Sequence, residues 1–162
     1  MRLAHIAERI LLTLWVGGLW AIGYLAVPVL FHSLNDRRLA GEVAGQMFGV
    51  LSLVGLVCGA LLLVRAIYVA GKKWSSAWRV WSLVVMLVLV AASAFVLQPM
   101  MQAIIETGKA AGLPSGLVQG STAAKHFGQL HGAASVMYLI TSLLGLALVA
   151  AGPGKERSAD YF

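Results

Sequence analysis

The stretch ILLTLWVGGLWAIGYLAVPVLF, residues Ile10–Phe31, is an apolar run that contains no charged side chain. Its 22 residues exceed the about 20 that an α-helix needs to cross the hydrocarbon core of a bilayer. The apolar core of a cleaved signal peptide is only about 7–15 residues long, so we interpret the run as a retained transmembrane helix.

Three further apolar runs follow, and the four are expected to cross a membrane at about residues 10–31, 43–64, 80–102 and 130–151. Gln98 and Pro99 stand near the end of the third run, where a proline is expected to bend or loosen the helix. Short connections make consecutive helices antiparallel. The sequence therefore predicts an all-α, integral membrane four-helix bundle over residues 1–152 and a short cytoplasmic tail at 153–162. We expect no long repeat and no pair of interrupted helices, the mark of a duplicated secondary transporter.

The composition excludes an ordinary soluble domain. Hydrophobic residues make up 60% of the 162-residue chain and charged residues 11%, whereas a soluble domain carries about 25% charged residues. The mean hydropathy is +0.86. The lysines and arginines behind the net charge of +6 stand at the ends of the apolar runs, as in membrane proteins, so we expect no nucleic-acid partner. A single cysteine, Cys58, excludes an internal disulfide.

The positive residues set the expected orientation, because the cytoplasmic connections of membrane proteins carry an excess of Lys and Arg. Eight of the twelve fall on the side of the two termini and four on the other. Both termini and the Gly71–Ala77 loop are therefore expected in the cytoplasm, with Arg65 reaching back to the same interface. On the opposite side, Ser33–Ala40 is expected to form a polar turn and Glu106–Gly120 an irregular loop. The eight are Arg2, Arg9, Arg65, Lys72, Lys73, Arg79, Lys155 and Arg157, and the four are Arg37, Arg38, Lys109 and Lys125.

Small residues at helical spacing predict where the helices pack, because close backbone approach drives helix association in lipid. The second run has the clearest stripe, which is expected to lie on one face. Such a stripe serves packing inside the bundle or contact with a second copy of the chain, and the sequence leaves both open. Its members are Gly41, Gly45, Gly49, Ser52, Gly55 and Gly59.

The candidates for chemistry are few. We find no charged residue near the middle of a predicted span and no nucleophile, carboxylate-pair or zinc motif, so an enzyme is not expected. His32 and His131 come from different helices and are candidate metal or haem ligands. Met100 and Met101 fall toward the same side, and thioether with imidazole suits Cu(I). Each of these residues also has an ordinary structural role, in packing or hydrogen bonding, and on balance no cofactor is expected.

The segments WVGGLWAIGYLAVPVLF (Trp15–Phe31), LAGEVAGQMF (Leu39–Phe48), LQPMMQAI (Leu97–Ile104) and HFGQLHGAAS (His126–Ser135) resemble the bacterial transmembrane protein 205-like family, also catalogued as domain of unknown function 4149. The resemblance implies a four-helix protein of the bacterial inner membrane whose molecular activity is not established. The residues that it singles out are Trp15, Trp20, Gln98, Pro99, Phe127, His131 and Ser135.

Three functions follow as hypotheses. The first is a small non-enzymatic binding, scaffold or accessory subunit in the lipid bilayer, associated with a second copy or another membrane protein. The second is a copper- or haem-handling protein that uses His131, His32 and the neighbouring methionines. The third is a small permease, which needs a polar cavity around Tyr24, Ser93, Ser135 and Tyr138.

Overall fold

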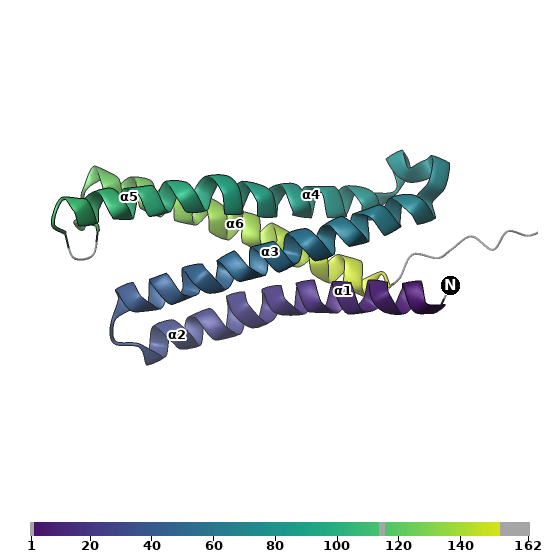
Figure 1. The fold of residues 1–162 in the computed structure, drawn as a ribbon, viewed down its shortest axis with the longest axis horizontal. Helices are drawn as coiled ribbons and strands as arrows, with labels where there is room; N and C mark the ends of the chain where they lie inside the picture. Colours follow the sequence, from purple (N-terminus) through teal and green to yellow (C-terminus); the bar gives the residue numbers. More distant parts are fainter. Residues whose placement is uncertain (1, 114–115, 153–162) are drawn as a thin grey trace, which may run out of the picture.

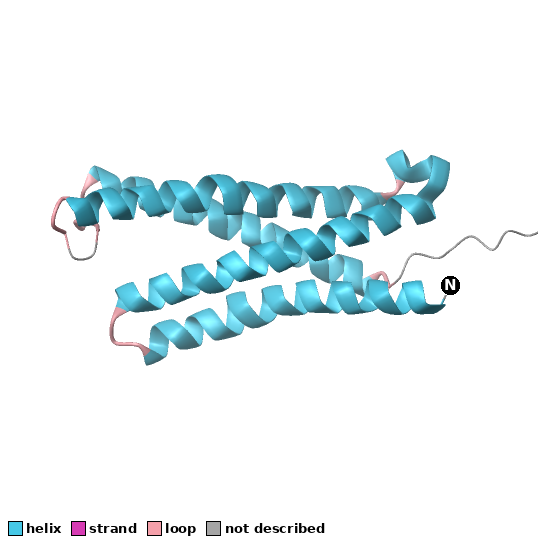
Figure 2. Cartoon of the chain, viewed as in Figure 1, coloured by secondary structure: helices cyan, strands magenta, loops and turns pink. Residues whose placement is uncertain are grey.

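The computed structural model describes residues 2–113 and 116–152, and within these ranges every regular element is helical (Figure 2). The predicted tail at 153–162 lies outside the described residues. In chain order the elements are α1 (Arg2–Trp20), η1 (Ala21–Ala26), α2 (Val27–Ser33), α3 (Arg37–Ala70), η2 (Gly71–Ser76), α4 (Trp78–Ala92), η3 (Ser93–Leu97), α5 (Gln98–Ala110) and α6 (Thr122–Ala150). The segments η1 and η3 are π-helical, and η2 is a 3₁₀ helix.

Four helical stretches of the described chain are long and apolar enough to cross a membrane: Leu3–Ser33, Arg37–Lys73, Trp78–Ala110 and Thr122–Ala150. The predicted all-helical fold with four such stretches is therefore confirmed. Each stretch is longer than its apolar run, because the helices continue into the polar sequence at their ends.

The helix boundaries correct the expected loops. The polar turn shrinks to Leu34–Asp36, because the Asp36 carboxylate accepts hydrogen bonds from the backbone N–H groups of Arg38 and Leu39 (2.8 and 3.3 Å) and starts α3 there. The expected loop Glu106–Gly120 is helical up to Ala110. The Gly71–Ala77 loop is also largely helical, since η2 occupies Gly71–Ser76.

The chain folds into two helical hairpins that cross. The first hairpin joins α1, η1 and α2 to α3, and the second joins α4, η3 and α5 to α6. In Figure 1, α3 begins beside α2 and ends beside α4, whereas α6 begins beside α5 and ends beside α1. As a result, the α2–α3 and α5–α6 connections lie well apart at the left of the view.

The buried core is concentrated in one half of the molecule. Trp15 and Met86 are fully buried, whereas η1, α2, η3 and α5 contain no buried residue; the first turns of α3 bury only the small side chains of Ala40 and Ala44. We call the half that contains the core and both the N-terminus and η2 the packed half. The half formed by η1, α2, η3, α5 and the first turns of α3 and α6 is the splayed half. The core cluster comprises Leu12, Trp15, Val16, Leu19, Leu51, Cys58, Leu62, Leu83, Met86, Val90 and Leu148.

The glycines of α3 divide between the two halves. A Cβ atom at Gly55 would lie 2.5 Å from Nε1 of Trp15, and one at Gly59 would lie 2.8 Å from the far edge of the same ring, so both glycines are needed for the indole to pack. A Cβ at Gly41, Gly45 or Gly49 would meet nothing within 4 Å. Residues four apart are offset by about 40° around a helix, so the stripe winds away from the core. Among the described residues no neighbour packs on these three glycines, so contact with a second copy, the other role that the sequence left open, stays a prediction.

Candidate functional site

Trp15 and Trp20 have different surroundings although they stand on the same helix. Trp15 is the central residue of the core, packed on α3. Trp20 is exposed and begins a row of aromatic rings at the border between the two halves. Its ring centroid is 4.7 Å from that of Tyr24, which is 6.0 Å from Tyr138, which in turn is 5.2 Å from Phe48 in an edge-on contact. The row links α1, η1, α6 and α3.

Tyr138 also ties α6 to the π-helical turn of the first hairpin. Its hydroxyl donates a hydrogen bond to the backbone carbonyl of Leu19, just before η1 begins. A Cβ at Gly23 would collide with the Tyr138 ring, so the glycine inside η1 lets the ring reach this carbonyl. Because π-helical turns occur often at functional sites, this junction is one part of the candidate site.

The second π-helical turn occupies the matching place in the second hairpin. Here η3 directly precedes Gln98 and Pro99, as η1 directly precedes Val27 and Pro28. The residues that flank both turns keep helical backbone angles, so each stretch continues through its π-helical turn without a break. The sequence predicted a loosened helix at Pro99 but no matched pair of irregular helices, and the pair is a feature that sequence reasoning missed.

Three of the motif residues lie together at the start of α6. The Phe127 and His131 rings stack, with centroids 6.1 Å apart and planes 5° apart. The Ser135 hydroxyl donates a hydrogen bond to the His131 carbonyl (2.8 Å). His131 precedes Tyr138 by seven residues, two turns along the same face, yet His131 is exposed. The face of α6 that enters the core in the packed half is therefore open in the splayed half.

The hydroxyl groups along this face bond to the helix backbone. Ser142 donates to the Tyr138 carbonyl and Thr141 to the Met137 carbonyl, both at 2.8 Å. Of the four residues expected to line a permease cavity, Ser135 and Tyr138 thus direct their hydroxyl protons to backbone carbonyls.

The candidate metal ligands are dispersed. His32, on α2, and His131, on α6, belong to different hairpins and are both exposed. Met100, but not Met101, lines a groove of about 480 Å³ between α5 and α6, where His126 stands on the opposite wall. Among the described residues, no three His, Cys, Asp or Glu side chains are grouped so that they could hold a metal ion. A thioether and an imidazole therefore line the same groove, but the histidine is His126.

A buried ionic network is the strongest polar feature of the packed half. Glu8 of α1 accepts a hydrogen bond from Arg65 Nε of α3 at 2.8 Å and from an Arg79 guanidinium nitrogen of α4 at 2.9 Å. Arg79 also donates to the Gly152 carbonyl, directly after α6. The side chains of Glu8, Arg65 and Arg79 are only 9, 17 and 18% exposed. We refer to these three side chains as the buried ionic network, and it connects all four long helices.

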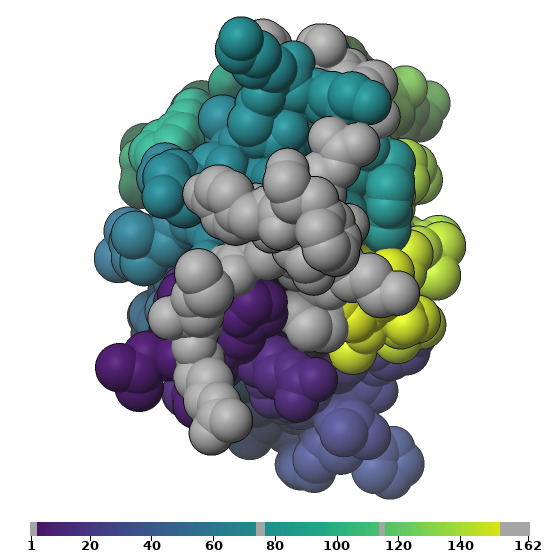
Figure 3. All heavy atoms as spheres, turned by 90° about the vertical axis from the view of Figure 1, so that its right-hand side faces the viewer, coloured from purple at the N-terminus to yellow at the C-terminus, as the bar shows by residue number. Residues whose placement is uncertain are grey.

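At the end of the molecule that Figure 3 faces, the first turns of α1, the region around η2 and the last turns of α6 come together. The sequence predicted that Arg65 reaches back to the interface but did not pair it with Glu8. Glu8 precedes the first span and Arg65 follows the second, so the sequence placed both at the same membrane interface. The sequence does not reveal which side of its helix each residue occupies.

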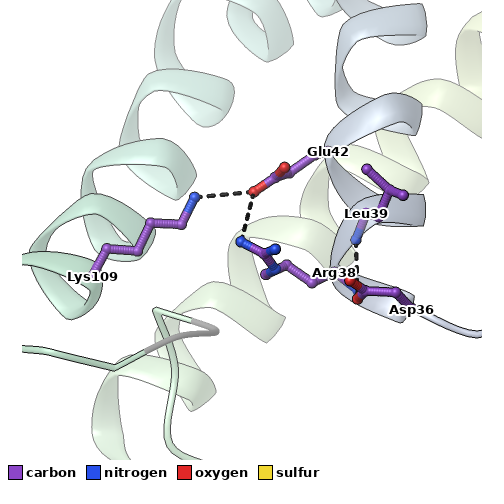
Figure 4. Close-up of polar contacts among 5 residues, drawn as sticks. All are labelled: Asp36, Arg38, Leu39, Glu42 and Lys109. Carbon is purple, nitrogen blue, oxygen red and sulfur yellow. Dashed lines mark hydrogen bonds and ion pairs between the residues drawn. The ribbon is translucent and has the colours of Figure 1, made fainter.

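A second ionic contact joins the hairpins in the splayed half. Lys109 of α5 contacts the Glu42 carboxylate of α3 at 3.0 Å, and Arg38 lies 3.9 Å from the same oxygen atom. Figure 4 shows Lys109 and Glu42 extended toward each other across the space between their helices. Their side chains are 42 and 44% exposed, so this contact is solvated whereas the buried ionic network is not.

Comparison with known proteins identifies a family but no characterised relative. No curated protein and no solved structure matches the chain. The family described as Domain of unknown function (DUF4149) matches residues 10–110, which include Trp15, Trp20, Gln98 and Pro99 and end before His131. Because this range covers more than half of the 162 residues, the chain belongs to the DUF4149 family.

Proposed function

We propose that this DUF4149 protein is a bacterial, transmembrane protein 205-like member that resides in the inner membrane with both termini in the cytoplasm. It acts as a non-enzymatic binding or accessory subunit, without a cofactor. Its partner is a second copy or another membrane protein, held within the lipid bilayer, and not a nucleic acid.

The perimeter supports a lipid environment. Large apolar side chains are exposed on every long helix, including Leu14, Leu53, Val88 and Leu143. Exposed apolar surface costs about 25 cal/mol per Å² in water, and lipid removes that cost. Each helix also satisfies its own backbone hydrogen bonds, as a segment in hydrocarbon must.

The observation that carries the binding function is the open face of α6 in the splayed half. Phe127, His131 and Ser135 extend the face that Tyr138 and Ser142 bury against the first hairpin, yet both His131 and Ser135 are exposed. An aromatic ring, an imidazole and a hydroxyl on one helix face are suited to packing and hydrogen bonding with another helix.

Photo-crosslinking in cells tests this function. We replace His131 with a benzoylphenylalanine residue, and use Leu143 on the same helix, which is exposed in the packed half, as the matched control. The expected result is a discrete protein adduct from position 131 and none from position 143. An absence of protein adducts at position 131, or the same adducts at both positions, would contradict the proposal.

Copper handling is a second candidate, supported by the groove between α5 and α6. Met100 and His126 line it from opposite walls, and this ligand pair suits Cu(I). Purified protein supplied with copper and haem is examined by metal mass spectrometry and visible absorption. Stoichiometric copper that is lost in Met100→Leu and His126→Ala variants, but kept in His32→Ala, would support this candidate. Protein without bound copper, or copper retained by all three variants, would exclude it.

A further inference from the structure

Within the described residues, one side of α3 has close neighbours in the packed half and none at its glycines in the splayed half. A Cβ at Gly59 would lie 2.7 Å from a methyl group of Leu87 on α4 and 2.8 Å from the Trp15 ring on α1, so this side of α3 faces α4 as well as α1. Gly45 precedes Gly59 by 14 residues, which places it about 40° away on nearly the same side. Beyond η3, α4 continues as α5, yet a Cβ at Gly45 would meet nothing within 4 Å. The helix on this side of α3 in the splayed half is therefore α5, but it does not pack against Gly45.

The ionic contact between the hairpins spans this same space. Glu42 precedes Gly45 by less than one turn of α3, and its partner Lys109 stands on the last turn of α5. The two long side chains bridge a separation that the helix backbones leave open (Figure 4). This solvated contact keeps α5 on the side of α3 that carries the glycines, but it does not bring the two helices into direct packing contact.

α5 packs closely against the α5–α6 connection at Gly108, where an added Cβ would collide with the Gly116 carbonyl, but it is otherwise loosely held on its other sides. It contains no buried residue, and two grooves of about 480 and 450 Å³ run along it, one against α6 and one against the α5–α6 connection. By contrast, α4 is fixed by Val80, Leu83, Met86 and Val90 in the core and by Arg79 in the buried ionic network. The π-helical turn η3, followed by Pro99, separates the fixed helix from the loose one.

From these observations we infer that the splayed half has a second, closed position in which α5 tilts about η3 and packs on Gly41, Gly45 and Gly49 of α3. Glycines let two helix backbones approach closely. π-helical turns and prolines are the usual places where a helix bends. The packed half and its buried ionic network stay in place during the movement. Closure is a property of the single chain and does not depend on the partner proposed above.

Distances between pairs of spin labels, measured in lipid nanodiscs in a Cys58→Ala background, test this movement. One pair, Gln46→Cys with Ala110→Cys, reports on α3 and α5 in the splayed half. The other, Tyr68→Cys with Val85→Cys, reports on α3 and α4 in the packed half; all four positions are exposed. The splayed pair is expected to give two distances, that of the structure and a shorter one, whereas the packed pair gives one.

Adding Gly45→Leu separates closure from general mobility. In the open position a larger side chain at residue 45 meets open space, but in the closed position it would lie between the helices. The shorter distance is therefore expected to disappear in Gly45→Leu and to persist in Val50→Leu, an exposed control on the same helix. An unchanged packed-pair distance shows that the variant is folded, and Gly49→Leu provides a second blocking variant.

Three results would overturn the inference. The first is a single distance for the splayed pair, and the second is a shorter distance that survives both blocking variants. The third is a shorter distance that disappears when labelled protein is diluted with unlabelled protein, since the distance would then lie between two copies.

Discussion

At the scale of single residues, Gly55 and Gly45 are the same residue type on one helix with opposite surroundings. Alanine in place of a helical glycine gains about 1 kcal/mol of helix propensity at either position. At Gly55 the added methyl must displace the buried Trp15 ring, and overpacking a core costs about 1–3 kcal/mol. We therefore expect Gly55→Ala to be less stable than Gly45→Ala by about 1–3 kcal/mol, measured as the free energy of unfolding in mixed micelles. Equal stabilities would show that the Trp15 contact is not a constraint.

The two ionic contacts between the hairpins differ in the same way. Glu8→Gln leaves two nearly buried guanidinium groups without their carboxylate, and breaking a buried pair costs about 3–5 kcal/mol. Glu42→Gln removes an exposed pair, for which a loss of about 0–1 kcal/mol is expected. Both changes remove one negative charge from a helix terminus, so each is a control for the other. A larger loss of unfolding free energy in Glu42→Gln than in Glu8→Gln would contradict the view that the buried Glu8 contacts stabilise the fold more than the exposed Glu42 contact.

At the scale of the elements, the Tyr138 hydroxyl supports the turn before η1. Tyr138→Phe keeps the ring contacts with Tyr24 and Phe48 and removes only the hydrogen bond to the Leu19 carbonyl. A hydrogen bond of this kind contributes about 0.5–1.5 kcal/mol. Amide hydrogen exchange across Ala21–Ala26 is expected to be faster by roughly 2- to 10-fold in this variant, and unchanged in Tyr24→Phe. Equal exchange in wild type and Tyr138→Phe would mean that η1 holds its shape unaided.

The elements also show what the sequence could predict. The four helices follow from the length of uncharged runs such as Ile10–Phe31, because that property depends on neighbours in the chain alone. Pro99 marked where the third stretch loosens, but a proline does not say whether the helix kinks or widens, so neither π-helical turn was predicted. Gly45 and Gly55 looked equivalent in sequence, since spacing identifies small residues but not the helix that meets them.

At the scale of the whole molecule, the crossing of the hairpins explains why the site was harder to predict than the fold. Glu8 and Arg79 are 71 residues apart; antiparallel helices put both at one end, but the crossing decides which sides of α1 and α4 face each other there. The same crossing separates the α2–α3 connection from the α5–α6 connection, which leaves His131 exposed on a face that is otherwise buried. The length of the apolar runs and the spacing of residues do not show which helix sides meet at the buried ionic network or which part of the α6 face stays exposed.

The orientation of the whole molecule is the last prediction. The end of the packed half holds Arg9, Arg65, Lys72, Lys73 and Arg79, more positive residues than the splayed end, so the packed end is expected in the cytoplasm. Exposed Lys72 and Lys125 mark the two ends. In a Cys58→Ala background, a membrane-impermeant maleimide is expected to label Lys125→Cys in intact spheroplasts and Lys72→Cys only after lysis. Each substitution removes one positive charge, so the two variants control for each other. Labelling of position 72 alone before lysis would invert the orientation, and the Phe127–His131 face would then open toward the cytoplasm.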